Sequence, residues 1–253
     1  MTNEQRGYTV KPFSRNRQLI LDAGWIAHRK HMFHGLIQVD VTKPRRFMRE
    51  HKARSGESLS FTAFIVACVG CAVDQDKRVH AYRDWRNRLI LFDDVDVLIA
   101  VEIEIDGRKF PLVHVIRAAN QRTFRDIHDE IRAIQADPSR SREMSFVRFF
   151  PFLPTFLRRI VYRLVARSPH LQKKNAGTVG LTNIGMFGTV SGWGIAMPAH
   201  TLAVTAGSVA DKPGLVDGQI EIREILNLTL SFDHDIVDGA PAARFAQYFK
   251  ELI

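Results

Sequence analysis

A histidine flanked by two acids follows an apolar strand pattern near the carboxyl end of the chain, in Asp233-His234-Asp235. Apolar and polar residues alternate from Leu226 to Phe232, which predicts a half-buried strand that delivers His234 to its end. Gly239 then breaks the strand, and helical spacing begins at Ala240. An imidazole held in such a turn can accept a proton near neutral pH. The sequence therefore predicts a general base at His234.

Two segments resemble the acyltransferase component of 2-oxo acid dehydrogenase complexes, with chloramphenicol acetyltransferase as a more distant relative. DHDIVDG, residues 233–239, is similar to that family's Asp-His-Arg-x-x-Asp-Gly signature, and GTVGLTNIGMFG, residues 177–188, places Thr182 where the family carries a hydroxyl. Further upstream, PFSRNRQLI, SLSFTAFIVACVGCAV, VDVLIAVEI and PLVHVIRAAN resemble the family's first helix, buried helix and strand pair. The resemblance covers nearly the whole chain.

The resemblance implies a fold, an assembly and a mechanism. The fold would be chloramphenicol acetyltransferase-like, an α/β two-layer arrangement of a mixed sheet with packed helices, and the subunits would form trimers or assemblies of trimers with the active site between them. His234 would deprotonate a thiol that accepts an acyl group from coenzyme A, and the Thr182 hydroxyl would stabilise the tetrahedral oxyanion.

Asp238 and Gly239 complete the signature. By resemblance, Asp238 would pair with an arginine, for which Arg17 is the best positional match and Arg15 the second. A different role for Asp238 is to cap the helix that follows, and both roles can hold at once. Gly239 is expected to serve the backbone geometry of the turn rather than the chemistry.

Three features depart from the family pattern. Asp235 stands where the family usually has arginine; either it lies close to His234 and favours the protonated imidazole, or it points to solvent and alters only the channel for the thiol. His80 stands where asparagine is usual, and we expect it to pack. We expect no lipoyl domain or hinge before the catalytic region, so that a lipoyl group would come from another protein, or the acyl carrier differs.

Composition favours one globular domain over residues 1–253. The 253 residues are 45% hydrophobic, which is enough for one substantial core. No uncharged apolar run is long enough to span a bilayer, and the polar start lacks the apolar core of a signal peptide, so we expect a soluble cytoplasmic protein. Cys68 and Cys71 fall in an apolar helix pattern and are interpreted as packing residues. No metal site is predicted there or at His28, His31 and His34.

Residues 140–175 carry most of the positive charge and form a predicted insertion. They contain nine Arg or Lys against Glu143, and five phenylalanines lie between Phe146 and Phe156. A helix restarting near Thr155 would place Arg158, Arg159 and Arg163 opposite one apolar stripe, which consists of Phe156, Leu157, Ile160, Val161, Leu164 and Val165. Either the stripe packs on the protein's own core, or the segment docks on an acidic carrier protein or an anionic membrane surface.

The remaining periodicity predicts helices alternating with long strands. Helices are expected at 14–30, 61–73, 124–134 and from 240 onward, and strands at 36–41, 89–92, 95–105, 112–116, 178–181, 202–209 and 220–232, with a turn at Asp106-Gly107. This order favours helices packed against a mixed sheet.

Two functions from different classes remain. The first is a coenzyme A-dependent acyltransferase that uses a homo-oligomeric site and an acyl-carrier or lipoyl-bearing partner protein. The second is a catalytically weakened trimeric scaffold that organises partner proteins. Nucleic-acid binding is not predicted, because the basic residues fall in no recognisable binding motif.

Overall fold

The computed structural model describes residues 8–105, 108–141, 150–185 and 192–253, and in it six strands form one mixed sheet. Strand β6 runs parallel to both of its neighbours, β4 and β7, and the other pairs are antiparallel. In spatial order the strands are β1 (Met32–Asp40), β8 (Gln219–Asp233), β7 (Leu202–Val216), β6 (Val179–Asn183), β4 (Val97–Ile105) and β5 (Arg108–Ile116).

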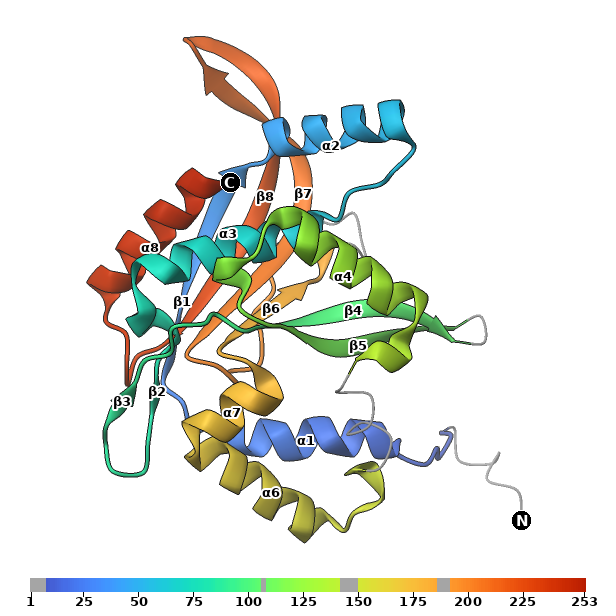
Figure 1. Cartoon of the computed structure of the whole chain (residues 1–253), viewed down its shortest axis with the longest axis vertical. Coiled ribbons are helices and arrows are strands. Elements are labelled where there is room, and N and C mark those ends of the chain that lie inside the picture. Colours follow the sequence, from blue (N-terminus) through green and yellow to red (C-terminus); the bar gives the residue numbers. More distant parts are fainter. Residues whose placement is uncertain (1–7, 106–107, 142–149, 186–191) are drawn as a thin grey trace.

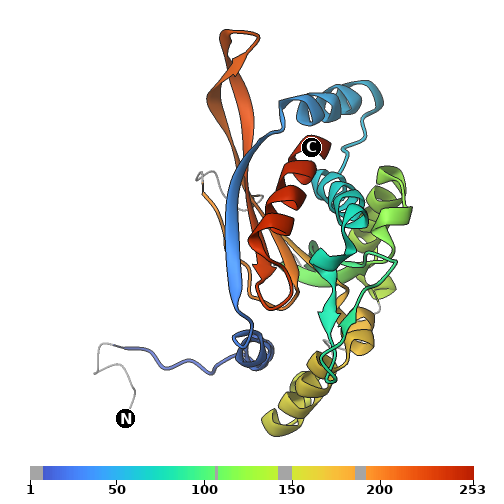
Figure 2. The same ribbon diagram turned by 90° about the vertical axis from the view of Figure 1, so that its left-hand side faces the viewer.

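Three helices cover one face of this sheet and close the core, as Figures 1 and 2 show. They are α3 (Phe61–Gln75), α4 (Phe124–Ala136) and α8 (Gly239–Leu252). The apolar residues of β8 and β7 pack against α3 and α8 in a single buried cluster. This arrangement confirms the predicted α/β layering of a mixed sheet with packed helices.

Helix α3 lies inside the molecule because its sequence is apolar on nearly every side. The Ser60 side chain accepts the Ala63 N–H at its start, which satisfies one free donor of the first turn. A Cβ at Gly70 would come within 2.8 Å of the backbone of Ala119, so the absence of a side chain permits this close approach. Cys68 is buried and burial raises its pKa to about 12, whereas Cys71 is exposed, so the expectation that both cysteines pack is wrong for Cys71.

Strand β8 differs from the half-buried strand predicted from its alternation. Its apolar residues face the core, but Asn227, Thr229, Ser231 and Asp233 on the other side are buried as well. Strand β1 supplies two of their partners, since Gln38 donates to Asn227 and His34 contacts Ser231. Alternation alone could not distinguish a solvated polar face from a buried hydrogen-bonded one.

Three of the described α-helices and strands are absent from the sequence prediction, namely α2 (Thr42–Ser55), β2 (Tyr82–Arg83) and α7 (Pro169–Ala176), whereas β3 (Leu89–Ile90) lies within the strand predicted at 89–92. Helix α2 buries none of its residues, so it has no apolar stripe from which a helix could be predicted. The predicted turn at 106–107 lies outside the described residues.

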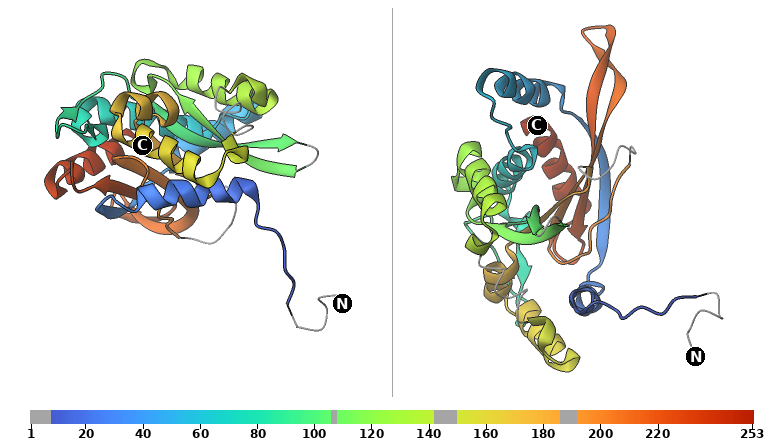
Figure 3. Two further views of the ribbon diagram at one scale, coloured as in Figure 1. Left: turned by 90° about the horizontal axis from the view of Figure 1, so that it is seen from below. Right: turned by 90° about the vertical axis from the view of Figure 1, so that its right-hand side faces the viewer.

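The two ends of the molecule differ. Helices α1 (Arg15–Ala27) and α6 (Thr155–Arg167) lie side by side at one end, and the tip of the β7–β8 hairpin projects at the other (Figure 1). The segment before α1 leads away from the body (Figures 2 and 3). Within the described parts of the chain, no helix has both the length and the apolarity to cross a bilayer.

Candidate active site

His234 directly follows β8, in the turn that leads into α8. Its backbone N–H donates to the carbonyl oxygen of His31 at 2.7 Å, and its ring lies against Phe33 with 4.9 Å between ring centroids. The side chain remains 53% exposed. The imidazole is therefore fixed on one side and accessible to a substrate on the other.

Asp233, the residue before the histidine, holds the turn between β8 and α8 through hydrogen bonds. Its carboxylate is buried and accepts a hydrogen bond from the Lys30 Nζ at 2.5 Å, while its other oxygen accepts the backbone N–H of Asp235 at 3.2 Å. Its carbonyl oxygen accepts the N–H groups of Ile236 and Val237. The sequence did not predict Lys30 as the partner of Asp233. Lys30 follows α1 and Asp233 ends β8, so no local spacing connects the two residues.

Asp235 is engaged by two basic side chains from other segments. Its Oδ1 lies 2.9 Å from the His31 Nδ1, and its Oδ2 lies 3.8 Å from the guanidinium of Arg83, on the β2–β3 hairpin. The hydrogen bond from His31 is the main reason that the pKa of Asp235 is lowered. The carboxylate thus pairs with His31 and Arg83, an arrangement that neither sequence alternative anticipated.

Asp238 occupies the N-cap position of α8 but its side chain makes no capping hydrogen bond. It is 86% exposed, and its Oδ1 lies 3.9 Å from the His234 Nδ1. Arg17 is exposed and lies roughly 15 Å along α1 from Ala27, at the rise of an α-helix. Among the described residues no ion pair joins Arg17 to Asp238 within one chain, and the side chain of Arg15 lies outside the described part.

Gly239 does not have the backbone role expected for it. Its φ is not in the left-handed region, and a Cβ built on it would meet nothing within 4 Å. Within one chain this position therefore accepts a side chain, and the expectation of a glycine required by the turn is wrong.

Thr182 is half-buried in β6, at a distance from His234. It lies opposite Thr205 of β7, which lies opposite Thr229 of β8, and the buried hydroxyls of Thr205 and Thr229 have no hydrogen-bond partner among the described residues. Two strand spacings amount to about 10 Å, and the path from Thr229 to His234 adds roughly 16 Å along β8. One chain does not bring the hydroxyl and the imidazole together. Residues 186–188 of the same motif lie outside the described residues.

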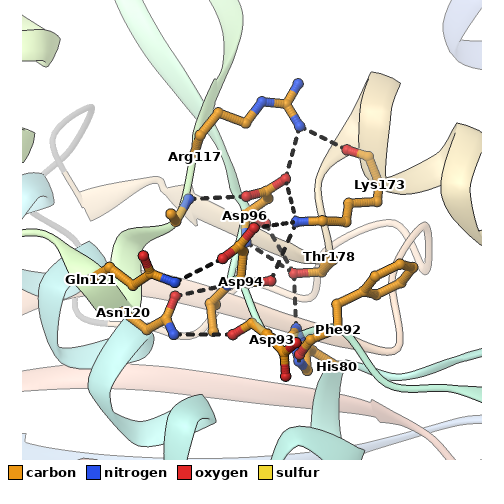
Figure 4. Close-up of polar contacts among 12 residues, drawn as sticks. His80, Phe92, Asp93, Asp94, Asp96, Arg117, Asn120, Gln121, Lys173 and Thr178 are labelled. Atoms are coloured by element: carbon orange, nitrogen blue, oxygen red, sulfur yellow. Dashed lines mark hydrogen bonds and ion pairs between the residues drawn. The ribbon is translucent and has the colours of Figure 1, made fainter.

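His80 lies next to the β2–β3 hairpin in the sequence and contacts Phe92, which follows β3 (Figure 4). Fully buried, it contacts the Thr178 hydroxyl through Nδ1 at 2.9 Å and the Phe92 carbonyl oxygen through Nε2 at 3.2 Å, and burial lowers its pKa to about 4. Thr178 in turn accepts the backbone N–H of Asp96. The neutral imidazole donates through Nε2 and accepts through Nδ1, so His80 packs as expected.

Asp96 is the centre of the neighbouring polar cluster in Figure 4. Its carboxylate is buried and receives hydrogen bonds from Arg117 at 2.9 Å, from Lys173 at 2.9 Å and from the backbone of Ala118 at 3.0 Å. These contacts tie β4 to β5 and α7. Two cations and a backbone N–H satisfy the carboxylate, which identifies this cluster as structural support.

Glu57, His128 and Asp129 lie close enough together to be considered as metal ligands. However, the His128 Nδ1 accepts the backbone N–H of Ser60, so the neutral ring carries its proton on Nε2, the atom that faces Glu57. Arg125 binds both Glu57 and Asp129. The donor set fits an ion-pair cluster better than a cation site.

The sequence of the chain is similar to that of known acyltransferases. The family model for the 2-oxoacid dehydrogenases acyltransferase (catalytic domain) matches residues 5–145 and 157–253. The chain is 25% identical over 224 residues to the lipoamide acyltransferase component of the branched-chain alpha-keto acid dehydrogenase complex of Bacillus subtilis (strain 168), a match that covers 86% of this chain and 45% of that protein. The chain spans less than half the length of the curated relatives that it matches.

Two solved structures show the same fold. One is the cubic core of the pyruvate dehydrogenase multienzyme complex, with a TM-score of 0.71 and 18% identity over 100% of this chain and 94% of that one. The other is chloramphenicol acetyltransferase, with a TM-score of 0.50 and 13% identity over 97% of each chain.

Proposed function

The chain belongs to the family of 2-oxoacid dehydrogenase acyltransferase catalytic domains, and from this membership we propose that it moves an acyl group between two thiols, one of them coenzyme A. The observation that carries the proposal is the placement of His234. Its ring is anchored by Phe33 and by the turn of Asp233, yet half of its surface is accessible.

In the proposed reaction His234 acts as a general base. A free thiol has a pKa of about 8.5 and is mostly protonated at neutral pH. The imidazole accepts the thiol proton, and the thiolate attacks the carbonyl carbon of the thioester. The tetrahedral intermediate then collapses, the carbon–sulfur bond to the first carrier breaks, and the leaving thiolate takes the proton back from His234.

Thr182 is the proposed oxyanion donor, from a neighbouring subunit. The hydroxyl and His234 lie too far apart within one sheet to serve the same substrate. A trimer with the site between subunits would bring the Thr182 of one copy to the His234 of another, and the same contact would allow Arg17 to reach Asp238. The similarity to the cubic core structure supports oligomeric assembly.

The acyl carrier is proposed from the names of the relatives. The Bacillus subtilis relative is a lipoamide acyltransferase component, so a dihydrolipoyl group on a partner protein is the natural second thiol. Cytoplasmic location and the absence of a metal from the reaction belong to the same proposal.

The test is transfer of an acetyl, succinyl or branched acyl group from coenzyme A to dihydrolipoamide by the purified chain. His234→Gln should lower kcat by roughly a hundredfold to ten-thousandfold, the contribution of a general base. His28→Gln is the matched control, because His28 is an exposed histidine just after α1, and it should retain normal kcat. Near-normal turnover of His234→Gln would show that the base assignment is wrong.

A trimeric scaffold is the second candidate. The acid at position 235, held by His31 and Arg83, favours an altered role for the turn. An oligomeric wild-type protein that transfers no acyl group to any tested thiol would support this scaffold over the enzyme.

A further inference from the structure

Helix α6 is amphipathic, but it presents its apolar side to solvent. Across Thr155–Arg167 the buried residue is Arg158, which is 3% exposed and whose Nε donates to the Asp22 carboxylate of α1 at 2.8 Å. Arg159 donates to the other oxygen of Asp22 at 3.0 Å. The alternative that the apolar stripe packs on the core while the arginines stay solvated is therefore wrong for Arg158, which Asp22 draws inward, whereas Arg159 and Arg163 remain exposed.

The outward side carries a straight row of large apolar side chains. Phe152, Phe156, Ile160 and Leu164 are 71%, 68%, 46% and 57% exposed. Residues four apart on a helix lie above one another, so Phe156, Ile160 and Leu164 form a continuous line. Phe152 precedes α6 in a short 3-10 turn. Soluble proteins rarely leave such a line uncovered unless it contacts something.

Cations border this row on the side of α1. The guanidinium groups of Arg29, Arg159 and Arg163 lie 5.0, 5.3 and 4.6 Å from the ring centroid of Trp25. A hollow of about 510 Å³ between α1 and α6 is lined by Arg29, Lys30, Arg163, Ala166 and Arg167, and no acid is among these described lining residues. A hollow of this composition fits phosphate groups.

These features favour a lipid surface as the occupant. A second copy of the same face would bring one cluster of arginines against another, which costs free energy. The helix lies at the extremity of the molecule (Figures 1 and 3). Phe156 and Ile160 line a hollow beside Trp25, and both side chains remain exposed. An exposed apolar line beside long basic side chains is the composition of helices that lie in the headgroup region of anionic membranes.

We propose that α6 and the end of α1 dock the protein on an anionic membrane surface. Phe156, Ile160 and Leu164 enter the boundary between headgroups and acyl chains, and Arg29, Arg163 and Arg167 bind lipid phosphates. This docking does not depend on the proposed acyl transfer.

The experiment is flotation of the full chain with vesicles of phosphatidylcholine alone and of phosphatidylcholine mixed equally with phosphatidylglycerol. Binding is expected to the anionic vesicles and to weaken with salt. The triple variant Phe156→Ser, Ile160→Ser, Leu164→Ser should bind the anionic vesicles on the order of a hundredfold more weakly. The reason is that three apolar side chains are no longer available for burial in the membrane. The matched control is the triple variant Leu215→Ser, Ile220→Ser, Ile222→Ser on the projecting hairpin. These three residues are at least as exposed as the row on α6, and their replacement should change nothing.

The contribution of the basic side chains of α6 to vesicle binding is tested by a matched pair of double variants. Arg163→Glu with Arg167→Glu should abolish binding, whereas Arg46→Glu with Lys52→Glu, two exposed residues of α2, should leave most of it at the same net charge. Equal loss in both pairs would mean unspecific attraction and would overturn the proposal.

Two further outcomes also overturn the proposal. Absence of binding by the wild type would do so and would favour an acidic protein as the occupant. A smaller molecular mass of the serine triple variant in solution would identify the row as a contact between copies of the chain.

Discussion

The Asp235 carboxylate accepts a hydrogen bond from the Nδ1 of His31 at 2.9 Å, one residue away from the candidate catalytic His234. Arg83 lies on the other oxygen of the same carboxylate. Asp235, the acid that departs from the family signature, therefore links the segment after α1 to the β2–β3 hairpin beside His234. Both oxygens of the carboxylate have partners in His31 and Arg83, which weakens the argument that Asp235 acts directly on His234.

Asp235→Arg should not raise acyl transfer, although it restores the residue usual in the family. The new guanidinium would face Arg83 and Lys30, and this repulsion should lower the free energy of unfolding by about 1 kcal/mol. Urea unfolding and kcat/KM measure the two effects, with Asp235→Asn as the milder control. A rise in kcat/KM for Asp235→Arg would show instead that the acid handicaps the base.

Thr182→Ala should lower kcat on the order of a hundredfold, because an oxyanion donor is lost, and Thr182→Ser should retain most activity. Thr205→Val is a matched control from the neighbouring strand, since it removes a buried hydroxyl that lacks a partner in the described structure, and it should leave kcat unchanged. Equal losses in Thr182→Ala and Thr182→Ser would assign Thr182 to packing.

The stability of the protein should fall as the pH is lowered from about 6.5 to about 4. Burial lowers the pKa of His80 to about 4 from an ordinary value of 6.5, so in this interval the unfolded chain binds a proton that the folded chain excludes. His200 is buried in the same way, with its pKa also lowered to about 4. Each such histidine contributes a slope of at most about 1.4 kcal/mol per pH unit.

His80→Asn tests this contribution, since it removes one of the two slopes and leaves His200 and the carboxylates unchanged. Urea unfolding at several pH values gives the difference. Identical slopes in wild type and His80→Asn would mean that His80 titrates normally in the folded protein.

Asp22→Asn should lower the free energy of unfolding by about 3 kcal/mol, because it leaves Arg158 buried without its counterion. Asp129→Asn is the control, since its pair with Arg125 is exposed, and it should cost less than about 0.5 kcal/mol. Adding Arg158→Met to Asp22→Asn should recover part of the loss. Additive costs in the double variant would show that the two side chains act independently.

The sequence alone determined the layering and the position of the proposed base, His234, at the end of a strand. The period-two pattern at β8 and the period-3.6 pattern at α4 predict their elements, because burial of one side imposes those periods, and the long apolar run predicts the buried helix α3. The break at Gly239 was enough to place His234 in a turn between a strand and a helix. Helix α2 escaped prediction because it buries nothing, so its sequence carries no periodic signal.

Only the tertiary structure decided which neighbouring residues contact each side of a helix or strand. The polar face of β8 is buried because β1 brings Gln38 and His34 opposite Asn227 and Ser231. Helix α6 buries Arg158 because Asp22, far away in the chain, is buried beside it. The partners of Asp233 and Asp235 come from Lys30, His31 and Arg83, which no local spacing relates to them. Periodicity shows how a helix or strand distributes its apolar and polar residues between two sides. Which other element packs on each side is fixed by long-range packing and charge.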